Sequence, residues 1–197
     1  MRPMIDLASV LSATVLPDLG VVLPGSGRTV SIARFLRLEV RADSPIERTS
    51  SCWAPNKPAI LLDGERTWAE FVLVRLLERA GWEGRWIKNW TGGREFCLDV
   101  DRSSPLPAVA ATTFARIHRQ AAALRGAGAW DVFAWNGLDV LFIESKQHRS
   151  SDSLNPNQRA WLEAALEVGV SSSRFAVVEY DAGRPLQRPA PGFGGAS

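Results

Sequence analysis

Trp130–Glu144 reads WDVFAWNGLDVLFIE, in which two apolar runs flank an Asn-Gly pair. Asn-Gly between apolar runs is the strongest short-range signal for a β-hairpin, because both residues tolerate the positive φ of a type I′ turn. The stretch therefore predicts a hairpin whose two-residue turn is Asn136-Gly137. Counting outward from that turn sets Trp135 opposite Leu138, Phe133 opposite Val140 and Asp131 opposite Phe142.

The predicted hairpin brings charged residues together at one of its ends. Side chains alternate along a strand, so Asp131, Glu144 and Lys146 share one face. In this register Asp131 and Glu144 are diagonal neighbours, about 7–8 Å apart between backbones. Asp131 interrupts an apolar strand, and an unpaired buried charge is costly enough to require a partner or a metal ion. Asp139 falls on the opposite face, beside the turn, where we expect a structural role.

Two carboxylates and an ammonium group in this arrangement predict a metal-dependent hydrolase. Mg²⁺ prefers oxygen ligands and is typically held by one or two carboxylates together with substrate phosphate oxygens. A lysine beside the ion could orient or deprotonate the attacking water, or neutralise charge that develops on the phosphate. Glu-x-Lys is also short enough to occur by chance at a solvated strand end, as a cross-strand ion pair, and that interpretation stays open.

The segment Thr67–Ala80 predicts a helix that carries a further acidic candidate. Thr67 followed three residues later by Glu70 is a capping-box pattern, and Gly81 stands where a helix C-terminus is expected. At 100° per residue Glu70 falls on the apolar side of this helix. It is therefore a cap partner, an extra metal or water ligand, or both.

A second helix is predicted directly after the Glu-x-Lys strand. Asn155 is a good N-cap, Pro156 suits the first helical position, and Gly169 follows the end at about Val168. Gln158 could complete the cap, yet its spacing also places it on the buried stripe of the helix. An inward amide at this position could contact the site or the DNA backbone.

The remaining pattern indicates an α/β fold. Short strands are expected at residues 85–90 and 94–100, a helix over residues 110–124, and a last strand at residues 175–180. Residues 61–181 are expected to form one domain. Residues 1–60 contain short apolar runs that could be strands but no motif, so they are expected to be an N-terminal extension of unknown role, and residues 182–197 a disordered Pro/Gly-rich tail.

Composition leaves the partner open. The chain has 197 residues, 46% of them hydrophobic, and a formal net charge of +2, so any basic surface must be local. Cys52 and Cys97 have no CxxC spacing and no histidine cluster nearby, which predicts two reduced thiols rather than a zinc site or a disulfide. No signal peptide and no membrane-spanning run is recognisable, so we expect a soluble cytoplasmic protein.

The residues 67–180 resemble the VRR-NUC branch (virus-type replication-repair nuclease) of the PD-(D/E)xK superfamily. The resemblance lies in Glu70 with Gly81-Trp82, Asp131 on its strand, Glu144-Ser145-Lys146, and the Gln-x-x-Trp-Leu of Gln158–Leu162. It implies a restriction-endonuclease-like mixed central sheet flanked by helices. It also implies that Asp131, Glu144 and the Ser145 carbonyl bind Mg²⁺ or Mn²⁺, that Lys146 is the catalytic lysine, and that Glu70 and Gln158 support the site.

This sequence departs from the family pattern at one position of the motif, and the function has alternatives. The family usually has proline before the aspartate, where Trp130 stands here, and the interval between the first helix and Asp131 is long. We expect a DNA nuclease, whether as a monomer, a homodimer or a larger assembly. A nucleic-acid-binding or assembly subunit with little catalysis, or a structural ion-pair network in an unrelated protein, are the alternatives. Candidate phosphate contacts are His148, Arg149 and Arg159, with Arg116 and Arg119 as further candidates.

Overall fold

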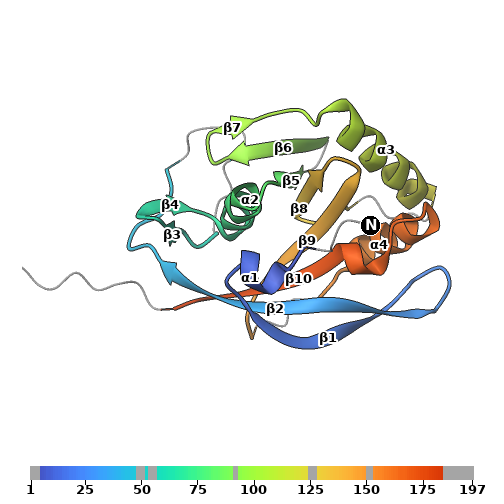
Figure 1. Cartoon of the computed structure of the whole chain (residues 1–197), viewed down its shortest axis with the longest axis horizontal. Helices are drawn as coiled ribbons and strands as arrows, with labels where there is room; N and C mark the ends of the chain where they lie inside the picture. The colour runs from blue at the N-terminus through green and yellow to red at the C-terminus, as the bar shows by residue number, and fades with distance from the viewer. Residues whose placement is uncertain are drawn as a thin grey trace, which may run out of the picture.

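The computed structural model describes residues 5–47, 52, 57–90, 93–123, 128–149 and 153–183. Within them, one sheet contains all ten strands (Figure 1). The strands are β1 (Thr14–Val22), β2 (Thr29–Arg41), β3 (Ile60–Leu62), β4 (Glu65–Thr67), β5 (Glu83–Trp90), β6 (Gly93–Asp99), β7 (Arg102–Ser103), β8 (Val132–Asn136), β9 (Asp139–Gln147) and β10 (Phe175–Ala182).

The sheet is mixed, which confirms the expected α/β class with a mixed central sheet. Its order is β4-β3-β2-β10-β9-β8-β5-β6-β7, and β1 pairs with β2 outside this path. β10 is parallel to both of its neighbours, β2 and β9, whereas the other pairs are antiparallel. Strands β10, β9 and β8 therefore lie in the middle of the sheet, and β8 and β9 are the strands of the predicted hairpin.

Helices cover both faces of the sheet (Figure 1). The helices are α1 (Leu7–Val10), α2 (Ala69–Arg79), α3 (Ala108–Ala123) and α4 (Pro156–Glu167), with a short 3₁₀ helix, η1 (Ser172–Arg174), before β10. α1 and α2 pack on the face of Val132 and Ile143. α3 and α4 pack on the face of Phe133 and Phe142. None of the helices in the described part of the chain is long and apolar enough to cross a membrane.

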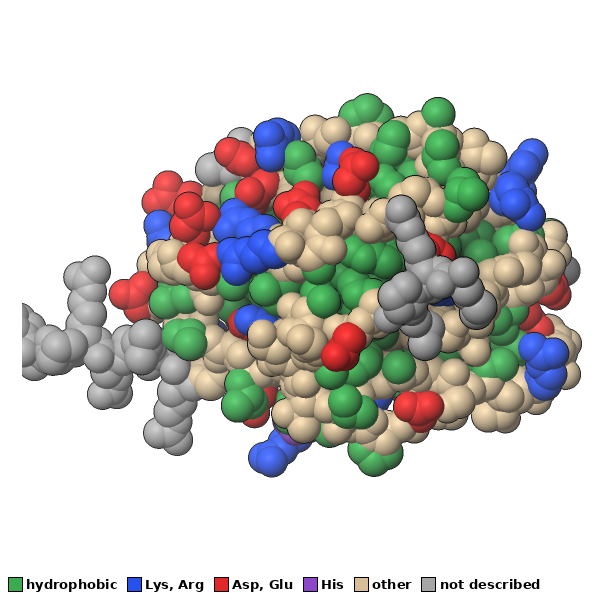
Figure 2. Space-filling view, viewed as in Figure 1, with side chains coloured by type: hydrophobic (Ala, Val, Ile, Leu, Met, Phe, Trp, Pro, Cys, Tyr) green, Lys and Arg blue, Asp and Glu red, His purple; other side chains and the backbone are tan. Residues whose placement is uncertain are grey.

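The charges on the surface are mixed in sign, as the composition suggested. Figure 2 shows acidic and basic side chains gathered mainly over the end of the molecule that carries β3, β4 and α2, whereas the middle of this face is largely hydrophobic. This face therefore presents no extended surface of a single charge.

The hairpin is present, but its predicted turn and register are wrong. Asn136 pairs with Asp139, so the two central turn residues are Gly137 and Leu138. Gly137 has φ 63°, whereas Leu138 is not at positive φ, as in a type II′ turn with glycine in first position. Each residue of β8 therefore pairs with a residue of β9 two positions later than predicted. Each side chain still lies on its predicted face of the sheet, because side chains alternate with a period of two.

The corrected register brings the two carboxylates closer than the sequence suggested. Phe133 pairs with Phe142 and Val132 with Ile143. Continuing this register sets Asp131 directly opposite Glu144 instead of diagonal to it. Directly opposite residues have Cβ atoms about 4.5–5.5 Å apart, so both carboxylates can reach a common ligand.

α2 begins later than predicted and lacks the expected capping box. Its N-cap is Trp68, without a side-chain hydrogen bond, and Thr67 is the last residue of β4. Glu70 is therefore not a cap partner, and Thr67 Oγ1 is buried without a hydrogen-bond partner in the part of the chain that the structure describes. The predicted C-terminus is confirmed, since Gly81 has φ 81° directly after the C-cap residue Ala80.

α4 is built as predicted. Asn155 accepts a hydrogen bond from the Gln158 backbone at 2.9 Å, and the Gln158 side chain accepts one from the Asn155 backbone at 2.9 Å, with Pro156 in the first turn. Gln158 is at the same time buried, with 7% of its surface exposed. One position of the Gln158 side chain therefore serves both expected roles, completing the helix cap and lying on the buried side of the helix.

The segment expected as an N-terminal extension shares the central sheet. β2 pairs with β10 over Ala33–Glu39, and Ile32 and Phe35 are buried. At the tip of the β1–β2 hairpin, Gly25 and Ser26 donate backbone hydrogen bonds to Glu163 of α4, at 2.6 and 2.7 Å. These two hydrogen bonds attach the hairpin to α4, the helix that carries Gln158. Most of the expected tail, residues 184–197, lies outside the described residues.

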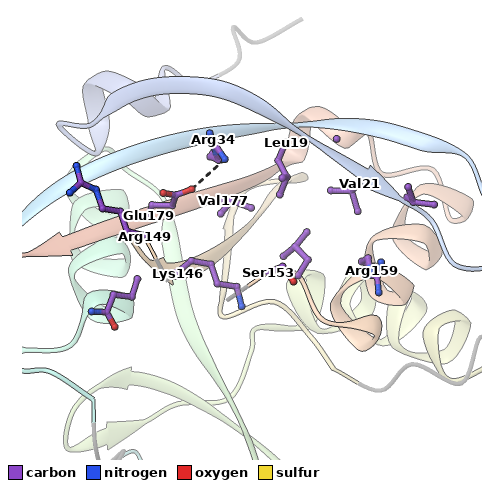
Figure 3. A pocket seen from close by; sticks show the side chains of 13 residues that line it. Leu19, Val21, Arg34, Lys146, Arg149, Ser153, Arg159, Val177 and Glu179 are labelled. Carbon is purple, nitrogen blue, oxygen red and sulfur yellow. Dashed lines mark ion pairs between the residues drawn. The ribbon is translucent and has the colours of Figure 1, made fainter. Parts of the chain in front are cut away.

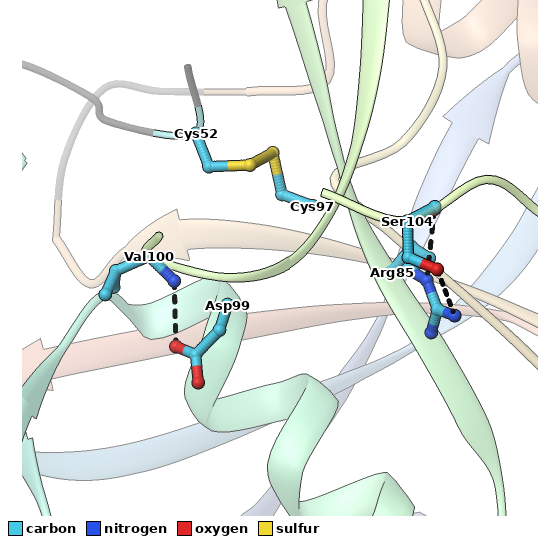
Figure 4. The surroundings of a disulfide bond; sticks show 6 residues. All are labelled: Cys52, Arg85, Cys97, Asp99, Val100 and Ser104. Atoms are coloured by element: carbon cyan, nitrogen blue, oxygen red, sulfur yellow. Dashed lines mark hydrogen bonds between the residues drawn. A yellow bond between two sulfur atoms is a disulfide. The ribbon is translucent and has the colours of Figure 1, made fainter. Parts of the chain in front are cut away.

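Cys52 and Cys97 form a disulfide bond, so the expectation of two reduced thiols is wrong (Figure 4). Both are completely buried and pack with Trp68, Phe71 and Trp86. The cysteines are 45 residues apart, and no local pattern shows that residue 52 lies against β6. Glu95 lies beside the two sulfur atoms, but sulfurs bonded to each other do not serve with it as thiolate metal ligands.

Candidate metal centre

A cavity of about 460 Å³ lies at the end of the β8–β9 hairpin where the predicted site residues meet. We call it the acidic cavity. It is lined by Lys57, Glu70, Asp131, Glu144, Ser145, Lys146, Gln147, Asn155 and Tyr180. All residues predicted to bind the metal, and the predicted catalytic lysine, are in this set. Gln158 is not part of the lining but contacts Glu144 from α4.

Backbone amides of the hairpin hold the carboxylates of Asp131 and Glu144 in place. The Asp131 amide donates to Glu144 Oε2 at 3.3 Å, and the Ser145 amide donates to Asp131 Oδ2 at 3.0 Å. These crossed hydrogen bonds arise because Asp131 directly precedes β8 and lies opposite Glu144 on β9. The strands therefore fix the direction of both carboxylates, and Ser145 contributes its backbone to the site.

Glu144 also contacts Gln158, a predicted supporting residue, and Lys146, the predicted catalytic lysine. Its Oε1 accepts a hydrogen bond from Gln158 Nε2 at 2.5 Å and lies 3.0 Å from Lys146 Nζ. Glu144, Lys146 and Gln158 are all buried, with 2%, 7% and 7% of their surfaces exposed. Buried charged groups of this kind are stable only when paired and hydrogen-bonded, which this network provides.

Glu70 approaches the acidic cavity from α2, on the other face of the sheet. It is 3% exposed, and its Oε1 accepts a hydrogen bond from Lys57 Nζ. Its Oε2 is buried and has no hydrogen-bond partner among the described residues. A buried carboxylate oxygen without a partner is costly, so this atom is suited to a ligand that enters the cavity.

Lys57 is the main residue of the site that the sequence did not indicate. Its ammonium group is paired with Glu70 and also lies 4.9 Å from the centre of the Trp86 ring. Burial lowers the pKa of Lys57, but the charges of Glu70 and Asp131 outweigh burial and hold the pKa above its ordinary value. The residue stands in a short segment between two prolines, where no periodic pattern marks its side chain as inward.

Burial and neighbouring charges raise the pKa values of Asp131 and Glu144. Burial raises the pKa of Asp131, and the charge of Glu70 raises it further. Burial also raises the pKa of Glu144 well above its ordinary value, with Asp131 adding to the effect and Lys146 opposing it. Neighbouring buried carboxylates behave in this way until a cation joins them.

These residues fit a hard divalent cation. The donors that face the acidic cavity are carboxylate oxygens from Asp131, Glu144 and Glu70, the ligand type that Mg²⁺ and Mn²⁺ prefer. Glu70 Oε2 is buried without a hydrogen-bond partner among the described residues, and burial raises the pKa values of Asp131 and Glu144, so a bound cation would favour the ionised form of these carboxylates. Asp131 and Glu144 would hold such an ion, with Glu70 available directly or through water.

The predicted phosphate-binding residues lie at different places. His148 Nδ1 is 2.6 Å from Glu179 Oε2, so its ring is engaged within the protein. Arg149 and Arg159 line a second cavity next to the acidic one. Arg116 donates to the Val168 carbonyl at 3.1 Å. Of the predicted basic residues, therefore, Arg149 and Arg159 are the ones placed beside the site.

No protein-family model matches this chain, and no curated protein or solved structure is significantly similar to it.

Proposed function

We propose that this protein is a metal-dependent nuclease that hydrolyses DNA phosphodiester bonds. The observation that carries the proposal is the meeting of Asp131, Glu144 and Lys146 on one face, at the open end of the β8–β9 hairpin. Two carboxylates that can share a cation, with a lysine directly beside them, are what metal-assisted hydrolysis of a phosphodiester requires. The likeness of the Glu-x-Lys and Gln-x-x-Trp-Leu segments to VRR-NUC nucleases supports the same proposal.

Each residue has a specific part in this reaction. A divalent ion bound in the acidic cavity would acidify a water molecule and polarise the scissile phosphate. Asp131 and Glu144 would hold the ion. Lys146 is 3.0 Å from Glu144 and borders the cavity, so its ammonium can orient the attacking water or neutralise charge on the phosphate. Gln158 fixes Glu144 through the 2.5 Å hydrogen bond.

One observation favours a second function, a DNA-binding or assembly subunit with little catalysis. Lys57 places a cation of the protein itself against Glu70, and its charge also acts on Asp131. This ammonium group partly neutralises the carboxylates that would otherwise need a metal ion. Under this alternative the acidic cavity is a structural ion-pair network, and the fold contributes a binding surface alone.

The test uses the full chain with circular DNA and with end-labelled linear DNA, each in Mg²⁺, Mn²⁺ or EDTA. Metal-dependent cleavage is expected. Asp131→Asn and Lys146→Met should each lower the single-turnover rate by about 100-fold or more, because each removes charge that acts on the reacting phosphate. Cleavage of the circle identifies an endonuclease, whereas cleavage confined to the linear DNA identifies an exonuclease.

Asp139→Asn is the matched control. Asp139 stands on the same hairpin but pairs with Arg174 at 2.7 Å, outside the acidic cavity. This variant should cleave like the wild type. Folded Asp131→Asn and Lys146→Met proteins that retain full activity would contradict the catalytic assignment. A wild type that binds DNA but cleaves none of it in either metal would support the binding subunit.

A further inference from the structure

A second cavity of about 410 Å³ adjoins the acidic cavity beneath the β1–β2 hairpin (Figure 3). We call it the arginine cleft. Its walls come from β1, β2 and β10, from the end of β9 and the residues that follow it, and from the start of α4. The two cavities share Lys146 and Gln147 in their linings. A ligand that extends from the acidic cavity past Lys146 would therefore enter the arginine cleft.

The charge of the arginine cleft is strongly positive. Among the described residues, four cationic side chains line it against one carboxylate, Glu179. They are Lys146, Arg34, Arg149 and Arg159 (Figure 3). Glu179 is largely engaged already, since His148 lies 2.6 Å from one of its oxygens and Arg34 lies 3.6 Å from the other. The arginine cleft is therefore the local basic surface that the near-neutral net charge of the chain did not reveal.

Two of these arginines have hydrogen-bond donors that the protein does not use. The Nε atoms of Arg34 and Arg159 are buried and have no hydrogen-bond partner among the described residues. Arg34 stands on β2, and Arg159 on the first turn of α4. Guanidinium groups offer donors in a fixed fork that matches phosphate oxygens. Arg34 and Arg159 both line the arginine cleft, so their guanidinium groups place positive charge on two of its walls, as an anionic ligand requires.

The rest of the arginine cleft is apolar. Leu19 and Val21 point into it from β1, and Val177 lies on β10 (Figure 3). Leu154 completes this apolar lining before α4. A nucleotide combines a charged phosphate with the flat, largely apolar faces of its base, so arginines and aliphatic walls suit it together. The volume is that of a small-molecule site, too small to hold duplex DNA.

We infer that the arginine cleft binds an unpaired nucleic-acid strand next to the phosphate that occupies the acidic cavity. The inference rests on the proposed function, because that phosphate sets the position of the strand. Arg34, Arg149 and Arg159 hold the phosphates of one or two neighbouring nucleotides, and the β1 side chains cover the base or sugar. The protein thus selects single-stranded ends, flaps or gaps over intact duplex.

The experiment measures binding separately from cleavage. Fluorescence anisotropy of a labelled single-stranded oligodeoxynucleotide, and of a blunt-ended hairpin duplex of equal length, is recorded in EDTA at several salt concentrations. Wild type should bind the single strand more tightly than the duplex. Arg34→Gln combined with Arg159→Gln should weaken single-strand binding by about tenfold or more, and each change should lower the salt slope by about 1.

Arg102→Gln is the matched control, because Arg102 is exposed on β7 and lines neither the arginine cleft nor the acidic cavity. It should bind like the wild type. Arg34 lies within the sheet, so thermal unfolding is measured for each variant. If Arg34→Gln unfolds early, Arg149→Gln with Arg159→Gln replaces it, since neither residue is in a strand. Unchanged single-strand affinity in a folded double variant, or equal affinity of the wild type for duplex, overturns the inference.

The failure of this inference is distinguishable from that of the nuclease proposal. In one outcome the wild type prefers single strands, the double variant loses this binding, and the wild type cleaves no DNA in Mg²⁺ or Mn²⁺. This outcome supports the assignment of the arginine cleft and refutes the nuclease proposal. A wild type that cleaves DNA, with a double variant that binds single strands as well as the wild type does, keeps the nuclease and refutes the cleft assignment.

Discussion

The side chain of Gln158 joins the start of α4 to Glu144. Its Oε1 accepts the Asn155 backbone N–H at 2.9 Å, and its Nε2 donates to Glu144 Oε1 at 2.5 Å. The capping box thus sets the rotamer of Gln158, and Gln158 in turn orients Glu144 toward the acidic cavity. A helix cap and a candidate metal ligand are therefore positioned by one amide.

Gln158→Ala should weaken divalent-metal binding by roughly 10–100-fold, because Glu144 loses the donor that orients it. Mn²⁺ affinity is measured by titration calorimetry. Asn155→Ala is the control, since it removes the other half of the capping box and should cost about 0.5–2 kcal/mol of stability while leaving the Gln158 amide in place. Equal loss of metal affinity in the two variants would show that only the helix end matters.

Lys57 should compete with a divalent ion for the carboxylates of the acidic cavity. Lys57→Met removes the ammonium group paired with Glu70, so the metal-free protein should be less stable, and Mg²⁺ should raise its melting temperature more than that of the wild type. Differential scanning fluorimetry across a Mg²⁺ series measures both effects. Lys88→Met, a lysine outside this cavity, is the control. An identical Mg²⁺ response in Lys57→Met and wild type would show that Lys57 and the ion do not compete.

The Cys52–Cys97 disulfide should stabilise the fold by closing a long loop. For a separation of 45 residues, loop-closure entropy gives about 4 kcal/mol as an upper estimate. Urea unfolding with and without reductant measures the loss. In Cys97→Ser the reductant should have no further effect. A wild type whose unfolding free energy does not change on reduction would contradict a stabilising role for the bond.

Glu163 should make the attachment of the β1–β2 hairpin sensitive to acid. Burial raises the pKa of Glu163, but hydrogen bonds from the Gly25 and Ser26 backbones outweigh burial and hold the pKa below its ordinary value of 4.5. A lowered folded-state pKa stabilises the protein above the unfolded-state pKa, and this contribution is lost as the pH falls through the folded-state value.

Glu163→Gln should therefore lower the unfolding free energy by about 1.5–3 kcal/mol at pH 7, the range for hydrogen bonds to a charged group. The difference from wild type should shrink below pH 4.5. Urea unfolding at pH 7 and at successively lower pH measures it. A difference that stays constant through this range would show that the charge of Glu163 does not hold the hairpin.

Local patterns predicted much of the fold. The Asn-Pro start of α4, the glycine after α2 and the period-two alternation of β8 and β9 depend on neighbouring residues, and the structure has all three. The turn was assigned one residue too early, because Asn-Gly favours a type I′ turn whereas the chain uses glycine alone at the first turn position. The face assignment survived this error because the register moved by an even number of residues.

The parts of the site that depend on distant contacts could not be predicted. Lys57 reaches Glu70 from a segment with no periodicity, and Cys52 meets Cys97 across 45 residues. Arg34 stands on β2, which joins the sheet by pairing with β10, a strand far away in the sequence. No local pattern therefore indicates that Arg34 and Arg159 line the same cleft. Such contacts follow from the order of strands in the sheet, which alternation alone does not specify.

The most direct test of the central claim is the binding of Mn²⁺ to the metal-free protein, followed by the loss of the free-ion signal in electron paramagnetic resonance. The account predicts one tightly bound Mn²⁺ per chain in the wild type and in Asp139→Asn, and its loss in Asp131→Asn. Asp131→Asn that binds Mn²⁺ as tightly as the wild type, or a wild type that binds none, would contradict a metal centre built on Asp131 and Glu144.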